Sequence, residues 1–160
     1  MPRRISIFNG PNLNLLGERE PEIYGATTLS SIEESCAALA ALLEVELDFR
    51  QTNHEGVMVD AIQEIRLTSD ALIINPAGLS FHSVPVLDAL RLFGKPIIEL
   101  HLSNIHARDK DHQNSIMSGA ATAVICGLGA YGYSVALLAA LRQLGPIECD
   151  LPDSISIGPV

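Results

Sequence analysis

Residues 5–25 read ISIFNGPNLNLLGEREPEIYG, a short apolar run followed by a long polar loop. The run Ile5–Phe8 is bounded by Asn9-Gly10-Pro11, which is typical of a buried first strand. A polar loop of this length is uncommon inside a compact domain and is usually functional. The loop carries Arg19 and Tyr24, and a nearby cation lowers the pKa of a phenol. Tyrosine ordinarily titrates at about 10, so this pairing predicts that Tyr24 serves as a base near neutral pH.

The apolar run is the first of five that alternate with helical patterns. The expected strands are Ile5–Asn9, Val45–Arg50, Ala71–Asn75, Pro96–Leu100 and Ala121–Cys126, and the expected helices are Ser30–Glu44, Val57–Thr68, Val84–Phe93 and Tyr131–Leu144. This alternation predicts a doubly wound parallel α/β sheet. Five strands favour a flavodoxin-like three-layer sandwich with the strand order 2-1-3-4-5. We expect residues 1–145 to form one catalytic domain, and the Gly- and Pro-punctuated residues 146–160 to form a C-terminal surface arm.

The composition predicts a globular protein with a well-buried core, since 48% of the 160 residues are hydrophobic. The formal net charge of −9 argues against nucleic acid or an anionic membrane as a partner. No apolar run approaches the roughly 20 residues of a membrane span, and the first apolar stretch is too short for a signal peptide. We therefore expect a cytoplasmic protein. Cys36, Cys126 and Cys149 match no disulfide or metal-binding pattern.

Polar residues collect where the parallel strands are expected to end, at one edge of the sheet. The loop at 9–24 follows the first strand, and the later groups are Thr52–Glu55, Asn75–Gly78 and Glu99–Asn104. Taken singly, such residues are ordinary turn formers, and this interpretation is favoured for Asn9, Asn14, Asn53 and Pro76. The convergence of four segments on the edge where open α/β sheets bind ligands predicts a functional site.

Glu99 and His101 are alternate residues of an expected strand and therefore share one face. A carboxylate beside an imidazole holds its tautomer and raises its pKa, as suits a general acid. The alternative is a buried pair that only ties the end of the strand. Ser103-Asn104 offers backbone N–H groups to an anion. Arg108 is either a cation at the mouth of the site or part of a weak surface salt bridge.

Two further patterns favour structural explanations. The stretch 127–132, GLGAYG, matches G-x-G-x-x-G, but it lies in the fifth unit and no ribose-binding acid follows it. We therefore expect close helix–sheet packing there. His101, His106, Asp109, Asp111 and His112 match no standard set of metal ligands. No metal or cofactor is predicted.

Several long and specific blocks occur together in one order. They are Asn9-Gly10-Pro11-Asn12-Leu13, Leu16-Gly17-x-Arg19-Glu20-Pro21-x-x-Tyr24-Gly25, Gln51-x-Asn53-His54-Glu55-Gly56, Ile74-Asn75-Pro76, Glu99-x-His101-Leu102-Ser103-Asn104-Ile105-His106-Ala107-Arg108 and Gly127-Leu128-Gly129-x-x-Gly132-Tyr133. Together they resemble the type II 3-dehydroquinate dehydratases across about residues 3–144.

The resemblance implies a flavodoxin-like subunit of a dodecamer built from trimers, working without a cofactor. It implies a lyase that dehydrates 3-dehydroquinate to 3-dehydroshikimate by anti elimination through an enolate. That reaction belongs to the shikimate pathway of aromatic amino acid biosynthesis and to quinate catabolism. By matching position, Tyr24 would remove the C2 proton, while Arg19 would lower the pKa of Tyr24 and close with the loop as a lid. His101, oriented by Glu99, would protonate the departing C1 hydroxyl.

The other matching positions are expected to bind the substrate. Asn12 would stabilise the enolate oxygen through a water, and Asn75 and the backbone of Leu102-Ser103 would hold the substrate, the latter taking its carboxylate. Asp88 would reach the site of a neighbouring subunit. Proton abstraction next to a ketone needs a base, an oxyanion stabiliser and an acid, and needs no metal.

The sequence departs from the family pattern where ring hydroxyls are expected to bind. The substrate-binding histidine of the family is replaced by Phe81, and a histidine follows one residue later at His82. His112 and Leu87 stand where the family has arginines. Arg108, His82 and His112 are the remaining candidates for substrate binding. A buried hydroxyl without its partner costs about 1–3 kcal/mol.

Four functional hypotheses are considered for a chain with these residues. One is a dehydratase that holds dehydroquinate less tightly. The second is a divergent paralogue that acts on, or merely binds, another cyclic polyhydroxy carboxylic acid. A catalytically silent small-molecule-binding or assembly subunit and a flavin or nucleotide carrier are the other two, and fold alone does not decide between them.

Overall fold

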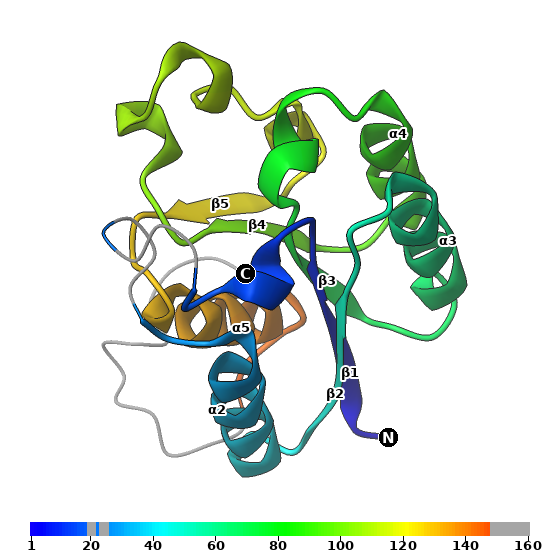
Figure 1. The fold of residues 1–160 in the computed structure, drawn as a ribbon. Helices are drawn as coiled ribbons and strands as arrows, with labels where there is room; N and C mark the ends of the chain where they lie inside the picture. The colour runs from blue at the N-terminus through cyan, green and yellow to red at the C-terminus, as the bar shows by residue number, and fades with distance from the viewer. Residues whose placement is uncertain (19–21, 23–25, 148–160) are drawn as a thin grey trace.

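The computed structural model describes residues 1–18, 22 and 26–147 (Figure 1). Its five parallel strands form one sheet in the order β2-β1-β3-β4-β5, which confirms the flavodoxin-like order predicted above. The strands are β1 (Arg3–Asn9), β2 (Val45–Gln51), β3 (Ala71–Asn75), β4 (Ile97–His101) and β5 (Ala123–Cys126). Since β2 and β3 lie on opposite sides of β1, the direction of winding reverses between β1 and β3. The carboxyl ends of strands at such a point are where ligands bind in open α/β sheets.

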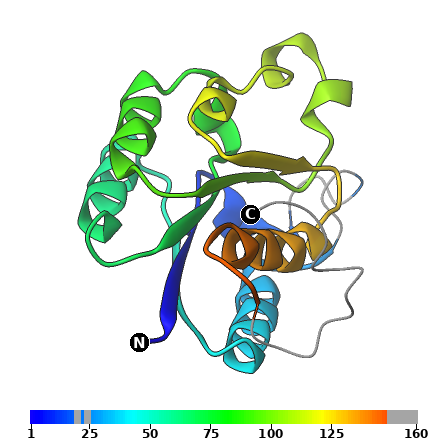
Figure 2. The same cartoon turned by 180° about the vertical axis from the view of Figure 1, so that it is seen from behind.

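Helices cover both faces of the sheet. They are α2 (Leu29–Leu42), α3 (Glu55–Ile65), α4 (Val84–Phe93) and α5 (Tyr131–Gln143). Helices α2 and α5 lie together on one face, and α3 and α4 lie together on the other (Figures 1 and 2). No helix in the described part of the chain is long and apolar enough to cross a membrane. Because helices cover both faces of the sheet, the predicted three-layer sandwich is confirmed.

Alternation along β1 divides the core between the two faces of the sheet. Ile5 and Ile7 pack with the residues of α2 and α5, whereas Phe8 packs with those of α3 and α4. Every residue of β3 is buried, as expected for a central strand covered on both faces. Cys36 of α2 is a core side chain, and its burial, together with the nearby charge of Glu33, raises the pKa of its thiol to about 11.

Several helices and strands begin or end at other residues than the apolar pattern predicts, because backbone hydrogen bonds lengthen or shorten them. Helix α3 begins at Glu55 rather than Val57, since the His54 carbonyl already accepts a helical bond from Met58 N. Strand β5 begins two residues later than expected, because Ala121 N donates to the Ser118 carbonyl in a turn. Strand β4 is shifted by one residue and ends at His101, so this histidine lies within the strand.

Only residues 146 and 147 of the expected C-terminal arm lie among the described residues. Pro146 is exposed, but Ile147 packs against the core cluster that lies beneath α2 and α5. The rest of the expected arm, residues 148–160, lies outside the described residues.

Candidate active site

A cavity of about 160 Å³ opens at the carboxyl ends of β1, β3 and β4, beside the reversal of the winding. Its lining is Asn12, Leu13 and Leu16 after β1; Asn75, Ala77, Gly78 and Phe81 from the end of β3; and His101, Leu102, Ser103, Ile105, Arg108 and His112 from the end of β4. The predicted convergence is thus confirmed for three of the four segments. Sites for drug-sized ligands measure roughly 300–1,000 Å³, so this cavity suits a small polar molecule better than a flavin.

The loop after β1 is held against β3 by a close approach that needs glycine. A Cβ atom on Gly10 would lie 2.3 Å from the carbonyl oxygen of Pro76. Gly10 N also donates to the Asn75 carbonyl oxygen at 2.8 Å. This contact brings the next residues, including Asn12, over the end of β3 and into the cavity wall.

The segment after β2 supports Asn12 instead of lining the cavity. Asn12 has a left-handed backbone, with φ at 68°, and its N–H donates to Asn53 Oδ1 at 2.9 Å. The same oxygen accepts from Gln51 Nε2 at 3.0 Å. The turn interpretation of Asn53 was therefore incomplete, because its side chain holds a residue of another loop. His54 and Glu55 of this segment are exposed.

Glu99 and His101 form a buried pair at the end of β4. His101 Nε2 lies 2.7 Å from Glu99 Oε1, which confirms that the two side chains share a face. Glu99 is 0% exposed, and its other oxygen accepts a bond from Ser118 Oγ at 2.6 Å. Burial by itself would raise the pKa of Glu99, but hydrogen bonds from His101, Ser115 and Ser118 together lower it. Glu99 is therefore a buried anion that receives hydrogen bonds from two segments of the chain.

The turn after β4 is fixed by the glycine-rich stretch. Gly129 N donates to the Leu102 carbonyl oxygen at 2.9 Å, just before Ser103 in the cavity wall. A Cβ on Gly132 would lie 2.9 Å from Leu100 Cδ1 of β4. This contact confirms the predicted close helix–sheet packing at Gly132, whereas Gly127 and Gly129 have positive φ values of 90° and 60° in the turn before α5.

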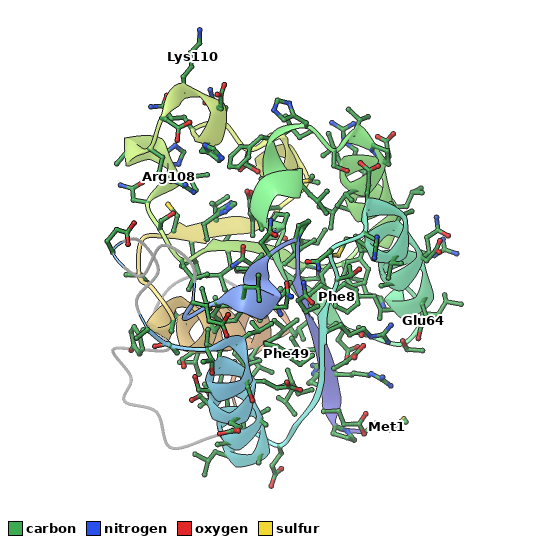
Figure 3. All side chains as sticks on the ribbon, in the orientation of Figure 1. Met1, Phe8, Phe49, Glu64, Arg108 and Lys110 are labelled. Carbon is green, nitrogen blue, oxygen red and sulfur yellow. The ribbon has the colours of Figure 1, made fainter. Side chains whose placement is uncertain are left out.

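The far wall of the cavity comes from the segment that follows β4 and projects from the body of the molecule (Figure 3). Arg108 lies on this segment, as does His112, whose ring meets the ring of Phe81 edge-on with centroids 5.3 Å apart. His112 Nδ1 also lies 2.7 Å from Asp109 Oδ1. The hydrogen bond from His112 is the main reason why the pKa of Asp109 is lowered. The wall thus offers a guanidinium and an imidazole beside an apolar ring.

Some predicted site residues lie elsewhere. His82 is exposed and does not line the cavity, because the one-residue shift places Phe81 there instead. Asp88 is exposed on α4, with one carboxylate oxygen 3.6 Å from Arg91. Arg19 and Tyr24 lie outside the described residues.

Sequence reasoning missed three residues that hold the site together. Ser115 and Ser118 bind Glu99 from η5 (Ile116–Gly119) and its cap, and Tyr133 of α5 contacts Asn75. The serines carried no periodic signal. Tyr133 carried one, since a polar aromatic side chain directly follows the glycine stretch in a buried helix. Within the described residues, no group of three His, Cys, Asp or Glu side chains is placed to hold a metal ion.

An open parallel sheet has a small polar cavity at its carboxyl edge, lined by a histidine that is paired with a buried carboxylate behind it. This arrangement defines a flavodoxin-like α/β protein with a site suited to acid–base chemistry. Comparison with known proteins is more specific, since the family model described as Dehydroquinase class II matches residues 3–141. The chain belongs to this family.

Individual relatives agree over most of their length. The chain is 53% identical over 135 residues to a protein of Pyricularia oryzae named "Catabolic 3-dehydroquinase", covering 83% of this chain and 86% of that one. It is 52% identical over 133 residues to the "3-dehydroquinate dehydratase" of Dinoroseobacter shibae, covering 83% and 89%. The crystal structure of a type II dehydroquinase from Butyrivibrio crossotus superposes with a TM-score of 0.86 at 32% identity, covering 88% of this chain and 98% of that one.

Proposed function

We propose that this protein is a lyase that dehydrates 3-dehydroquinate to 3-dehydroshikimate. The observation that carries this proposal is that His101, paired with the buried Glu99, lines a cavity sized for a small acid. Membership of the dehydroquinase family supplies the substrate, since the relatives are named for it. The same names favour a place in aromatic amino acid biosynthesis or in quinate catabolism.

The elimination requires a base on one side of the substrate ring and an acid on the other. Arg19 lowers the pKa of the Tyr24 phenol, and the resulting phenolate takes the proton from C2. The electrons of the broken C–H bond then form an enolate at the neighbouring ketone. Asn12 stabilises the enolate oxygen through a water. The enolate then collapses, the bond from C1 to its hydroxyl breaks, and His101 gives a proton to the leaving oxygen. Water and the conjugated enone are the products, so atoms and charge balance.

The contact between Glu99 and His101 supports delivery of the proton from one particular ring nitrogen of His101. Glu99 is ionised and can only accept, so the hydrogen between the pair resides on His101 Nε2. The proton for the leaving group is therefore delivered from Nδ1, and the pair in its acid form is an imidazolium beside a carboxylate. Removal of the hydroxyl leaves the histidine neutral and still held by Glu99.

Cationic and N–H groups bind the anionic substrate against the protein's net charge of −9. Asn75 and the backbone of Leu102 and Ser103 hold the substrate, the backbone taking the carboxylate. Arg108 and His112 supply positive charge or donors at the cavity wall. His82 keeps a part in binding only if the ligand or a neighbouring loop draws it inward, since it is exposed here.

The proposed assembly is a cytoplasmic dodecamer built from trimers, in which Asp88 reaches the site of a neighbouring subunit. The exposure of Asp88 on the outer side of α4 supports this role.

Appearance of the enone product, measured by ultraviolet absorbance with dehydroquinate as substrate, tests the proposed reaction. Tyr24→Phe deletes only the ionisable oxygen of the base and should abolish turnover. Tyr131→Phe makes the same deletion at a side chain that is 69% exposed on α5 and should leave turnover unchanged. Substantial activity in Tyr24→Phe would remove Tyr24 from the mechanism.

Phe81 in the cavity wall favours a second candidate, a paralogue specific for another cyclic polyhydroxy acid. An apolar ring binds a hydroxyl poorly, so a ligand without a hydroxyl at that place would fit better. Failure of the parent protein to turn over dehydroquinate, with turnover of a related acid, would establish this candidate.

A further inference from the structure

Tyr133 joins the ends of two central strands beneath the cavity. Its side chain is 1% exposed, and its hydroxyl donates to Asn9 Oδ1 at 2.6 Å and accepts from Asn75 Nδ2 at 3.1 Å. Asn9 and Asn75 are the last residues of β1 and β3, and they are partners in the strand register. Asn75 lines the cavity, whereas Asn9 and Tyr133 do not.

The hydrogen bonds are all donated in one direction, from Asn75 through Tyr133 and Asn9 to a backbone carbonyl. The carbonyl of Arg50 can only accept, so Asn9 must turn its Nδ2 toward it, at 3.0 Å. That choice directs Asn9 Oδ1 at Tyr133, and the Tyr133 hydroxyl must spend its single hydrogen there. Only lone pairs of the hydroxyl are then left for Asn75, so Asn75 has to present its Nδ2 to Tyr133.

We propose that Tyr133 is a positioning residue that sets the orientation of the Asn75 amide for ligand binding. With one Nδ2 hydrogen held by Tyr133 and Oδ1 accepting from Ala77 N at 3.4 Å, no acceptor among the described residues takes the second hydrogen. Asn75 therefore offers the cavity an N–H donor, which suits a hydroxyl or carboxylate oxygen. A flipped amide would offer its oxygen in place of that donor.

Burial keeps the hydrogen-bonded chain of Asn9, Tyr133 and Asn75, called the relay below, in one protonation state. It raises the pKa of Tyr133 well above its ordinary value, the hydrogen bond from Asn75 opposing this effect. The phenol therefore keeps its proton at every pH at which the enzyme would be assayed. The identity of the ligand in this inference rests on the proposed function.

Tyr133→Phe removes the relay and keeps the ring, and Tyr131→Phe is the matched control on the same helix. With dehydroquinate, Tyr133→Phe should raise KM about tenfold with a smaller change in kcat, as expected when one hydrogen bond used in uniform binding is lost. Tyr131→Phe should leave KM unchanged. In an Asn75→Ala background, Tyr133→Phe should change KM no further, because Tyr133 acts only through Asn75.

Asn9→Ala is a second, independent variant that acts at a residue outside the cavity. It frees the hydrogen of Tyr133, so the Asn75 amide is no longer forced to turn its nitrogen inward, and KM should rise here too. A purely structural role would lower Tm in both variants and leave the KM of the folded protein unchanged. That result, or an equal increase in KM with and without Asn75, would overturn the inference.

A neutron crystal structure of Tyr133→Phe, which distinguishes the amide nitrogen from the oxygen, provides a test that needs no turnover. We expect the Asn75 amide to flip or to leave its parental position, and an amide that keeps its parental position and orientation would contradict the inference. Absence of turnover in the parent protein, by contrast, would count against the proposed function alone.

Discussion

Glu99 shows how two opposing effects set the charge of one buried side chain. Burial favours the neutral acid, whereas three hydrogen bonds favour the anion and outweigh burial. The lowered pKa means that Glu99 adds to the free energy of unfolding above the ordinary Glu pKa of about 4.3. This contribution is lost as the pH falls through the pKa of the folded state.

Removal of the Ser118 hydroxyl should shift this balance. Ser118→Ala removes one of the hydrogen bonds that stabilise the Glu99 anion, whereas burial still favours the neutral acid. The pKa of Glu99 should therefore rise. Glu99 would then be protonated at a higher pH, and the acidic limb of the kcat profile should move upward. We also expect a loss of about 1–3 kcal/mol in the free energy of unfolding at neutral pH. Ser35→Ala on the exposed side of α2 serves as control, and an unchanged pH profile in Ser118→Ala would contradict the role of this serine.

The ring pair of Phe81 and His112 leads to a prediction about affinity. These residues occupy cavity positions at which the family pattern has polar groups with more donors. The triple variant Phe81→His, His82→Thr and His112→Arg should therefore lower KM for dehydroquinate and change kcat little. Steady-state kinetics would measure both values. A gain of dehydroquinate activity that the parent lacks altogether would instead identify a different natural ligand.

At the scale of an element, α3 and α5 have a glycine at the same place for different reasons. Gly56 is the second residue of α3, and a Cβ there would meet nothing within 4 Å. Gly132 is the second residue of α5, and its Cβ would meet Leu100, which is buried in β4 between Glu99 and His101. The first glycine is only a weak helix former, whereas the second permits close contact between α5 and β4.

The two glycine-to-alanine variants should therefore change stability in opposite directions. Gly56→Ala should raise the free energy of unfolding by about 0.5–1 kcal/mol, because alanine loses less entropy in a helix. Gly132→Ala should lower it by about 1–3 kcal/mol, because the added methyl overpacks the interface with β4. Urea denaturation of both variants would measure the difference. Equal effects would mean that the Leu100 contact relaxes without cost.

At the scale of the whole molecule, α4 presents an apolar stripe around a carboxylate. Val84, Asp88 and Leu92 lie four residues apart and share one face of the helix, and all three are exposed. An exposed apolar face of this kind favours contact with another copy of the chain. The same face carries the residue proposed to reach a neighbouring subunit.

Light scattering after size exclusion should find an assembly of about twelve chains of 17.1 kDa. Leu92→Glu should reduce this mass, because it places a charge in the α4 stripe. Leu67→Glu, at an exposed leucine outside that helix, should leave the mass unchanged. A parent protein that runs as a stable monomer would reject both the assembly and the proposed reach of Asp88.

Local periodicity and spacing were enough to predict the layers of the fold and part of the site. Alternating apolar runs and helical patterns led to the five parallel strands, because each pattern reports the face that an element buries. The strand order was predicted from the number of strands, since a doubly wound sheet of five strands favours it. Alternation along a single strand also placed Glu99 beside His101. The packing explanation of the glycine stretch was correct for Gly132, which lies against Leu100 of β4, whereas Gly129 has open space around its Cβ position.

The partners of these residues came from contacts that no local pattern encodes. Tyr133 and Asn9 are 124 residues apart in the sequence, Asn12 and Asn53 are 41 apart, and Ser118 and Glu99 are 19 apart. Periodicity tells which way a side chain faces, but a hydrogen bond also requires two elements to meet at a particular register and distance. The choice between Phe81 and His82 was of the same kind, because the turn of η2 (Ala77–Phe81) sets which of two neighbouring side chains enters the cavity.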